Sequence, residues 1–309
     1  MMAQAQNHSM PEFALNLRGA FETGVAMSRY TSWRVGGQAD YMFTPADEED
    51  LVTLIQELPQ EIPVFWLGLG SNLLVRDAGF EGVVIRTQKG LNKLEQISDT
   101  DVYAQTGVAC AKMARYTSQR KLSGVEFLSG VPGTIGGALA MNAGAFGGET
   151  WDWVKSIRCC TADGEVVELK QDQLEKGYRY VNLPKGYGIL SAIFALNVDE
   201  SITDGREKIK NLLEKRGNSQ PVQSANAGSV FRNPTGDYAA RLLEESGLKG
   251  HQIGGASYST KHANFIINHG DATANDIELL IELGQSRVLE NFNIKLEPEV
   301  RIIGRQRNG

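Results

Sequence analysis

The sequence predicts an α+β protein with a larger N-terminal domain and a smaller C-terminal domain, and three observations support this fold class. Short apolar, strand-like runs alternate with a few amphipathic helices through the first two thirds of the chain. A charged amphipathic helix at 204–216 follows the last of these strands and precedes a second mixed segment. The length of 309 residues, 41% of them hydrophobic and 22% charged, is sufficient for two domains.

The elements of the larger domain follow from local patterns. Thr44-Pro45-Ala46-Asp47 combines an N-cap residue, a proline at the first helical position and an acidic first turn, and therefore predicts a helix start. One face of this helix is apolar: Leu51, Leu54, Ile55 and Leu58. The remaining predictions are strands at 62–67, 73–75, 83–85, 102–108 and 189–197, a helix at 111–119, and a hairpin joining 157–161 to 165–169.

The smaller domain is predicted to contain helices at 238–246 and 277–291 and short strands at 263–267 and 300–303. We place the domain boundary just before the charged helix at 204–216. The C-terminal domain is therefore a smaller α+β unit.

Composition excludes several classes of function. A net charge of -6 argues against a nucleic-acid-binding surface, and no apolar run approaches the ~20 residues that span a bilayer. The polar N-terminus does not resemble a signal peptide, so we expect a cytoplasmic protein without membrane insertion. We expect no metal site, because the cysteines and histidines lack ligand spacing: Cys110, Cys159, Cys160, His8, His251, His262 and His269.

Two glycine-dense loops are the main functional signal. Gly68-Leu69-Gly70-Ser71-Asn72 follows an apolar strand, and seven glycines lie between Gly130 and Gly148. Glycine lets several backbone N–H groups approach an anion, so the pair of loops indicates a bound phosphate. The alternative is that the glycines serve only turns and close packing. Neither loop fits the dinucleotide or P-loop fingerprint, because Leu73 replaces the last glycine of the first and no Gly-Lys-Ser/Thr follows.

Three other residues are candidates for chemistry, each with a simpler alternative. Ser229 lies in a crowded loop without the G-x-S-x-G context of a hydrolase, and it could simply cap a turn. Glu299 precedes a strand, where a carboxylate can be functional or merely solvated. Arg179 lies between Tyr178 and Tyr180, which could direct it toward an anion or leave it as a surface arginine.

In this order, six motifs resemble those of the UDP-N-acetylenolpyruvoylglucosamine reductases, a family of flavoenzymes. The resemblance extends over roughly residues 31–304. Each motif alone is weak, but six collinear motifs are specific. They are Thr31-Ser32-Trp33-Arg34-Val35-Gly36-Gly37-Gln38-Ala39, Gly68-Leu69-Gly70-Ser71-Asn72, the Gly130 to Gly148 run, Gly177-Tyr178-Arg179, Gly228-Ser229-Val230-Phe231-Arg232-Asn233-Pro234 and Glu297-Pro298-Glu299-Val300.

The resemblance implies a fold like that of the vanillyl-alcohol-oxidase flavoproteins. Residues 1–28 would be an N-terminal extension, residues 29–198 an FAD-binding domain of two subdomains split near 101, and residues 199–309 a substrate-binding domain. FAD would be bound non-covalently. Its implied contacts are Arg34, Gly68, Gly70, Ser71, Asn72, Gly130, Gly133, Gly136, Gly137, Asn142 and Gly144.

The implied activity is the NADPH-dependent reduction of UDP-N-acetylglucosamine enolpyruvate to UDP-N-acetylmuramate, a precursor of peptidoglycan. By motif match, Arg179 and Glu299 would engage the enolpyruvyl carboxylate and Ser229 would donate the proton. A cation beside the developing negative charge and a hydroxyl within reach of carbon suit this reaction. The implied substrate contacts are Tyr178, Arg232 and Asn233.

The chain resembles the shorter form of the family, because the interval from Arg179 to Ser229 leaves no room for an inserted tyrosine loop. It departs from the family pattern at Arg232, where lysine is common, and at Tyr180-Val181, where Asp-Ser is expected. Two alternative functions remain: an FAD-dependent sugar or lactone oxidase of the same fold, and a flavin-free nucleotide-sugar-binding or transferase protein. We favour a monomer, although the sequence leaves the oligomeric state open.

Overall fold

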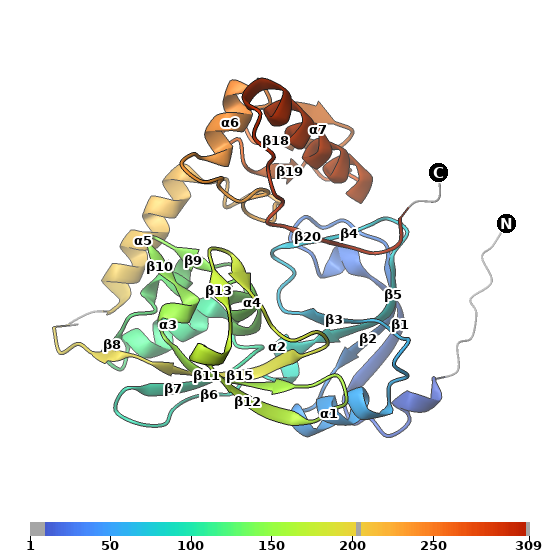
Figure 1. Ribbon diagram of the computed structural model, residues 1–309, viewed down its shortest axis with the longest axis vertical. Helices are drawn as coiled ribbons and strands as arrows, with labels where there is room; N and C mark the ends of the chain where they lie inside the picture. Colours follow the sequence, from blue (N-terminus) through green and yellow to red (C-terminus); the bar gives the residue numbers. More distant parts are fainter. Residues whose placement is uncertain (1–9, 202–204, 307–309) are drawn as a thin grey trace.

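A computed structural model describes residues 10–201 and 205–306 as three units (Figure 1). Two units built on sheets lie side by side, the first in blue and the second mainly in green. A third unit, in orange and red, lies above them and contains α7 (Ala274–Phe292), the longest helix among the described residues. No helix in the described part of the chain is both long enough and apolar enough to span a membrane.

The first unit is a four-stranded sheet in the order β1-β2-β5-β3. The strands, in that order, are Ala20–Ala26, Gln38–Thr44, Phe80–Arg86 and Val64–Leu67. β1 is antiparallel to β2, and β5 is parallel to both β2 and β3. Helix α1 (Glu48–Glu57) buries Leu51 and Leu54 in a cluster with residues of β2 and β5. The short helix α2 (Thr87–Gly90) follows β5.

Two boundaries in this unit differ from the sequence predictions. Strand β2 continues through Thr44, and α1 has Asp47 as its N-cap, with the Asp47 carboxylate 2.9 Å from the backbone nitrogen of Asp50. The predicted N-cap at Thr44 is therefore wrong, because Thr44 is still part of strand β2 and the helix begins three residues later than predicted. The range 1–28, predicted as an extension, includes β1, which pairs with β2 as an edge strand of the sheet.

The second unit is an antiparallel sheet in the order β12-β11-β15-β7-β6. The strands, in that order, are Val166–Lys170, Val154–Cys160, Gly188–Ala195, Asp101–Gln105 and Leu94–Gln96. The predicted hairpin is confirmed, since Ile157 pairs with Leu169. Helix α3 (Cys110–Ser118), the 3-10 helix η3 (Glu126–Gly130) and helix α4 (Ile135–Ala140) share one core with the sheet.

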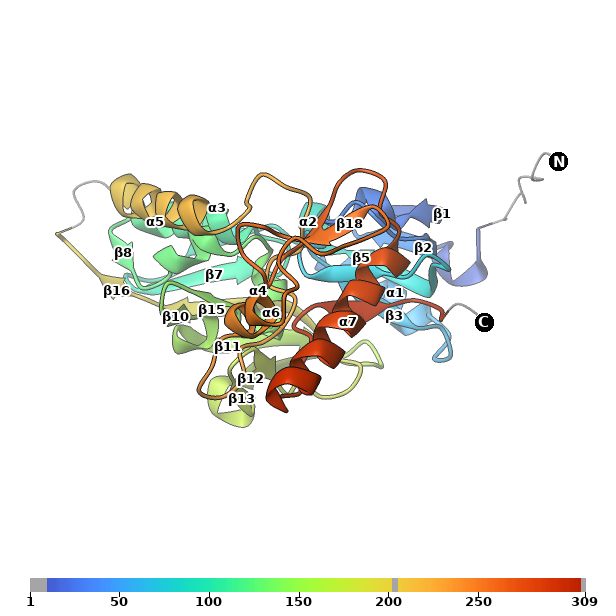
Figure 2. The ribbon, with the colours of Figure 1, turned by 90° about the horizontal axis from the view of Figure 1, so that it is seen from above.

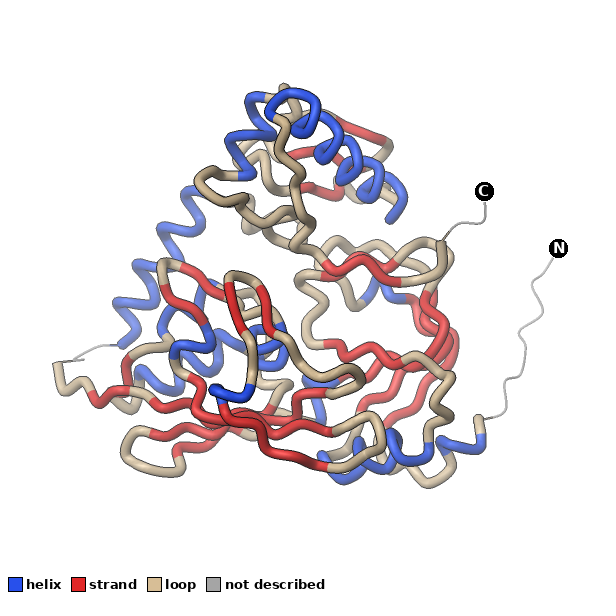
Figure 3. The backbone as a smooth tube through the Cα atoms, in the orientation of Figure 1, coloured by secondary structure: helices blue, strands red, loops and turns tan. Residues whose placement is uncertain are grey.

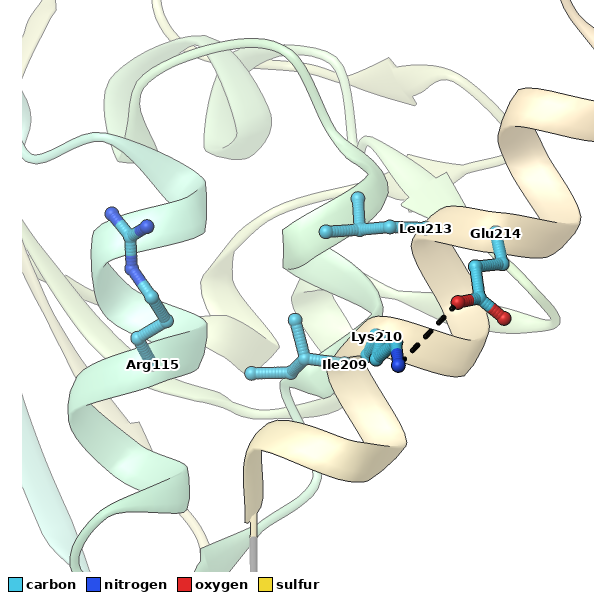
Figure 4. A pocket seen from close by; sticks show the side chains of 5 residues that line it. All are labelled: Arg115, Ile209, Lys210, Leu213 and Glu214. Carbon is cyan, nitrogen blue, oxygen red and sulfur yellow. Dashed lines mark ion pairs between the residues drawn. The ribbon is translucent and has the colours of Figure 1, made fainter.

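Helix α5 (Gly205–Ser219) packs on this second unit, although we had assigned its sequence to the C-terminal domain. Ile209 belongs to the second unit's core, and Lys208 Nζ lies 2.5 Å from Glu126 Oε1. Seen from above, α5 lies beside α3 (Figure 2). Between the two helices is a hollow of about 400 Å³, which Figure 4 shows; it is lined by Arg115, Ile209, Lys210, Leu213 and Glu214.

The third unit contains a sheet in the order β17-β18-β19 and the helices α6 and α7. In the order β17, β18, β19, α6, α7, the bounds are Gln252–Ile253, Ala256–Tyr258, Ile266–Asn268, Ala239–Glu245 and Ala274–Phe292. Trp33 of the first unit is fully buried in this core, and its indole Nε1 donates to the carbonyl oxygen of Ile266 at 2.7 Å. The Thr31–Ala39 motif therefore joins the first and third units.

Short strand pairs complete the structure. β4 (Leu73–Val75) and β20 (Arg301–Ile303) pair in parallel and connect the first glycine loop to the C-terminal part of the chain. The other pairs are β9 with β10, β13 with β14 and β16 with β8. Their bounds, in that order, are Gly144–Ala145, Gly148–Glu149, Lys176–Gly177, Tyr180–Val181, Asn197–Val198 and Leu122–Ser123.

Candidate active site

A cleft of about 920 Å³ is lined by residues of all three units. In the tube view, loops make up much of the chain between these units (Figure 3). Both glycine loops line the cleft, as do Arg179, Ser229 and Glu299. Its volume lies within the range of small-molecule sites. The residues that the sequence singled out for chemistry therefore surround one space.

The first glycine loop follows strand β3 and requires glycine at its centre. Gly70 has φ +63°, a left-handed conformation that other residues seldom adopt. A Cβ atom there would also clash with the carbonyl oxygen of Tyr30, and the backbone nitrogen of Ser32 donates to the Gly70 carbonyl at 3.0 Å. The loop is thus held against the segment after β1.

The second glycine run faces the first loop. A Cβ atom on Gly68 would lie 2.5 Å from Thr134 Oγ1, and one on Gly133 would lie 3.5 Å from Ser71 Oγ. A Cβ atom at Gly68 would be too close to the Thr134 side chain, so glycine there lets Thr134 pack against the first loop. Residues of both loops line the cleft and form a cradle in which a phosphate-bearing cofactor fits.

Arg179 is held at the cleft wall by three acceptors. Its Nη2 and Nη1 donate to the carbonyl oxygens of Gly144 and Asn142 at 2.9 and 3.3 Å, and its Nε donates to Glu299 Oε1 at 3.2 Å. The ring of Tyr178 lies 5.0 Å from the guanidinium carbon, within cation–π range. Arg179 itself has φ +56°. The hydrogen bonds fix the guanidinium while leaving it on the surface of the cleft.

Glu299 is largely buried beside Arg179, with side-chain exposures of 19% and 16% respectively. Burial raises the pKa of the Glu299 carboxyl above its ordinary value, and the positive charge of Arg179 opposes this shift. The backbone nitrogen of Glu299 donates to the carbonyl oxygen of Val230 at 2.7 Å. This hydrogen bond brings Glu299 next to the segment that carries Ser229, which lines the same cleft.

Four other predicted site residues lie at different positions. Asn233 lines the cleft, and its Oδ1 accepts from the backbone nitrogen of Ala239 at 3.1 Å. Arg232 is outside the cleft lining and lies 3.7 Å from Glu297. Asn142 is buried behind the lining, where it bonds to Glu149 and to the backbone. Arg34 is exposed and does not line the cleft. The proposed ligand contacts of these residues stay predictions.

Arg216 is a cleft residue that sequence reasoning missed. It lies near the end of α5 and donates from Nε to Gln220 Oε1 at 2.9 Å. Among the described ion pairs, none involves Arg216. Burial lowers the pKa of its guanidinium, which stays charged at neutral pH. One arginine in a highly charged helix carries no distinguishing sequence signal.

The fold and the cleft define an FAD-dependent oxidoreductase. Residues 39–170 match the family described as an FAD binding domain, and residues 220–303 match the UDP-N-acetylenolpyruvoylglucosamine reductase, C-terminal domain. A UDP-N-acetylenolpyruvoylglucosamine reductase of Methylococcus capsulatus is 48% identical, over 93% of this chain and 94% of that protein. The UDP-N-acetylenolpyruvoylglucosamine reductase of Nitrosococcus oceani is 45% identical, over 94% of this chain and 97% of that protein. This chain therefore belongs to the UDP-N-acetylenolpyruvoylglucosamine reductase family.

A solved structure extends this result to the fold. The crystal structure of UDP-N-acetylenolpyruvylglucosamine reductase from Thermus caldophilus has a TM-score of 0.79 and 31% identity. The match covers 93% of this chain and 99% of the Thermus caldophilus chain. The predicted fold class, an FAD-binding unit followed by a smaller α+β C-terminal domain, is confirmed.

Proposed function

We propose that this protein reduces the enolpyruvyl ether of UDP-N-acetylglucosamine enolpyruvate to UDP-N-acetylmuramate, with NADPH as the reductant and FAD as the bound cofactor. One observation carries the proposal: Arg179, Glu299 and Ser229 line the same cleft as both glycine loops. A cation, a carboxyl and a hydroxyl are thereby grouped beside a cradle suited to a phosphate-bearing cofactor. Residues 39–170 match an FAD-binding family, which agrees with that cradle.

The cofactor and the protein divide the chemistry. The chemistry that FAD would supply when bound is the transfer of a hydride from NADPH to the terminal methylene carbon of the substrate. The glycine loops would hold the pyrophosphate of FAD through backbone N–H groups. Arg179 binds the substrate carboxylate and stabilises the negative charge that develops on it and on the neighbouring carbon. Ser229 then donates its hydroxyl proton to that carbon, which completes the reduction, and the serine regains a proton from solvent.

Glu299 contributes through its position beside Arg179. Burial raises the pKa of its carboxyl, and Glu299 Oε1 accepts from Arg179 Nε, so Glu299 helps to fix the substrate carboxylate by holding the guanidinium that binds it. Arg179 has one N–H directed at Glu299 and two at backbone carbonyls, so its guanidinium plane is fixed before the substrate arrives. Such preorganisation avoids reorganisation during the reaction. Arg216 adds a second cation for a phosphate group of a ligand.

We also propose that the protein acts as a monomer in the cytoplasm, in the synthesis of peptidoglycan precursors. The supporting argument for the location is chemical, since the proposed reactants NADPH and a UDP-sugar are nucleotides of the cell interior. The oligomeric state is tested by light scattering of the purified protein. A single species of about 34 kDa is the expected result for a chain of 33.8 kDa.

The function is tested by an anaerobic visible spectrum of the purified protein, recorded before and after NADPH and then after the enolpyruvyl substrate. Flavin bands that bleach with NADPH and return with the substrate support both half-reactions. Return with oxygen but not with the substrate indicates a sugar or lactone oxidase instead. A protein without flavin bands, even after incubation with FAD, favours the flavin-free nucleotide-sugar-binding alternative.

A further inference from the structure

We propose that Asn72 of the first glycine loop is a positioning residue that holds Glu299 in place for the reaction with the enolpyruvyl substrate. The inference rests on the proposed function for its catalytic readout. Family resemblance implies only that Asn72 contacts the cofactor. The structure directs its side-chain amide toward Glu299 instead: Asn72 Nδ2 donates to the carbonyl oxygen of Glu299 at 3.0 Å.

The contact belongs to a continuous pattern of hydrogen bonds. The carbonyl oxygen of Asn72 accepts from the backbone nitrogen of Arg301 at 3.0 Å, and β4 pairs with β20 immediately beyond. The side-chain and main-chain groups of Asn72 thus hold the chain on both sides of Val300. Because the glycine loop also lines the cleft, Asn72 connects the cleft wall to the main chain of Glu299, the residue that carries the carboxyl.

On its opposite side, Glu299 is held by the segment that follows Ser229. The Glu299 backbone nitrogen donates to Val230 at 2.7 Å, and the Arg232 nitrogen donates to Glu297 at 2.9 Å. Glu299 therefore lies between the cofactor loop and the Ser229 segment. Without the Asn72 amide, one of these two attachments is weakened, and the carboxyl can shift relative to Ser229 and Arg179.

The fold itself does not require this side chain. Asn72 has no left-handed backbone conformation that would favour asparagine. The backbone pairing of β4 with β20 does not involve its amide group. Among the described residues, Glu299 is the only hydrogen-bond partner of the Asn72 side chain. A substitution at this position can therefore weaken the attachment of Glu299 while leaving the cradle intact.

The test compares Asn72→Ala and Asn72→Asp with Asn92→Ala, a control outside the cleft lining whose side-chain amide also donates to a backbone carbonyl, that of Lys89 at 3.0 Å. Aspartate keeps the shape of asparagine but lacks the donor. In the holoenzyme, reoxidation of reduced flavin by the enolpyruvyl substrate should slow by about 10- to 100-fold in both Asn72 variants, since displacement of a reacting group by about 1 Å has an effect of this order. Flavin reduction by NADPH should slow less than reoxidation does. Equal losses in both half-reactions, or loss of FAD, would overturn the proposal.

A double-mutant cycle separates positioning from an independent contribution. If Asn72 acts through Glu299, then Asn72→Ala should slow reoxidation little further in a Glu299→Gln background. Multiplicative effects of the two substitutions would overturn the proposal. Both results assume that wild-type flavin is reoxidised by the substrate; if it is not, the proposed function fails on its own.

A measurement that needs no substrate distinguishes failure of the positioning role of Asn72 from failure of the proposed function. Amide hydrogen exchange in residues 297–301 of the FAD-loaded protein should be faster in Asn72→Ala than in wild type, because one attachment of this segment is lost. The Asn92→Ala variant should match wild type there. Unchanged exchange in Asn72→Ala would overturn the positioning role whatever the catalytic activity.

Discussion

The ion pair between Arg76 and Glu278 should attach the third unit to the first, and its contribution can be measured. Arg76 follows strand β4, and Glu278 lies in α7. Nη2 and Nε of Arg76 contact Glu278 Oε1 at 2.7 and 3.0 Å, and Nε also contacts Oε2 at 3.1 Å. The substitutions Arg76→Met and Glu278→Gln, alone and combined, form a thermodynamic cycle that isolates the interaction.

The expected coupling free energy follows from the pair's geometry and burial. Exposed pairs contribute about 0.2–1 kcal/mol, and hydrogen bonds to charged groups about 1.5–3 kcal/mol. The Arg76 and Glu278 side chains are only 24% and 22% exposed and make several hydrogen bonds, so we expect a coupling of about 2 kcal/mol. A chain of 309 residues has an unfolding entropy of about 0.65 kcal/mol/K, so this corresponds to about 3 °C in melting temperature.

Thermal unfolding of the FAD-loaded wild type and the three variants is the assay. A matched control comes from the same helix: Arg287 and Glu290 are 4.0 Å apart, with side chains 56% and 63% exposed. The cycle of Arg287→Met and Glu290→Gln should show a coupling near zero. If the Arg76 and Glu278 cycle gives no larger non-additivity than the control cycle, the inferred attachment by this pair is refuted.

Three further predictions test the site. Ser229→Ala should leave flavin reduction by NADPH nearly intact and slow reoxidation by the substrate by orders of magnitude in single-turnover kinetics; equal losses in both steps would contradict the role as proton donor. Gly70→Ala should lower FAD affinity and melting temperature, because its left-handed φ and its contact with Tyr30 exclude a Cβ; unchanged FAD titration and melting would refute this reading. Burial raises the pKa of the Glu299 carboxyl in the folded protein above its ordinary value of 4.5. The protonated carboxyl therefore stabilises the fold fully at pH values below 4.5, and this stabilisation is lost as the pH rises through the folded pKa. As the pH rises through this window, the wild type should therefore lose melting temperature relative to Glu299→Gln. Parallel plots of melting temperature against pH for the two proteins would contradict the raised pKa.

Local signals predicted most of the individual elements. The hairpin between 157–161 and 165–169 was confirmed because its turn and both strands lie in one short segment. The helix start at Thr44 was wrong because the β2–β5 sheet, formed by distant residues, extends the strand through that position. Strand β1 was missed inside the predicted extension, since an edge strand with mostly exposed residues lacks a clear apolar alternation.

The site was predictable in its composition but not in its internal contacts. The glycine loops carry their signal in consecutive residues, so both could be found without knowledge of the fold. The burial of Trp33 in the third unit, and the position of Arg216 at the end of α5, depend on packing between distant segments. The same limit applies to Arg34 and Arg232, whose residue type suggests an anion contact although neither lines the cleft.

The arrangement around Glu299 gives a physical reason why the family motifs occur together. The Glu299 segment bonds to Asn72 on one side and to Val230 on the other, and its carboxyl bonds to Arg179. Three segments that are far apart in sequence therefore hold the main chain or the carboxyl of Glu299, and each of them also lines the cleft with at least one residue. Since a displacement of about 1 Å affects reaction rates strongly, a change in any of these segments should reduce the rate of the substrate half-reaction before it unfolds the protein.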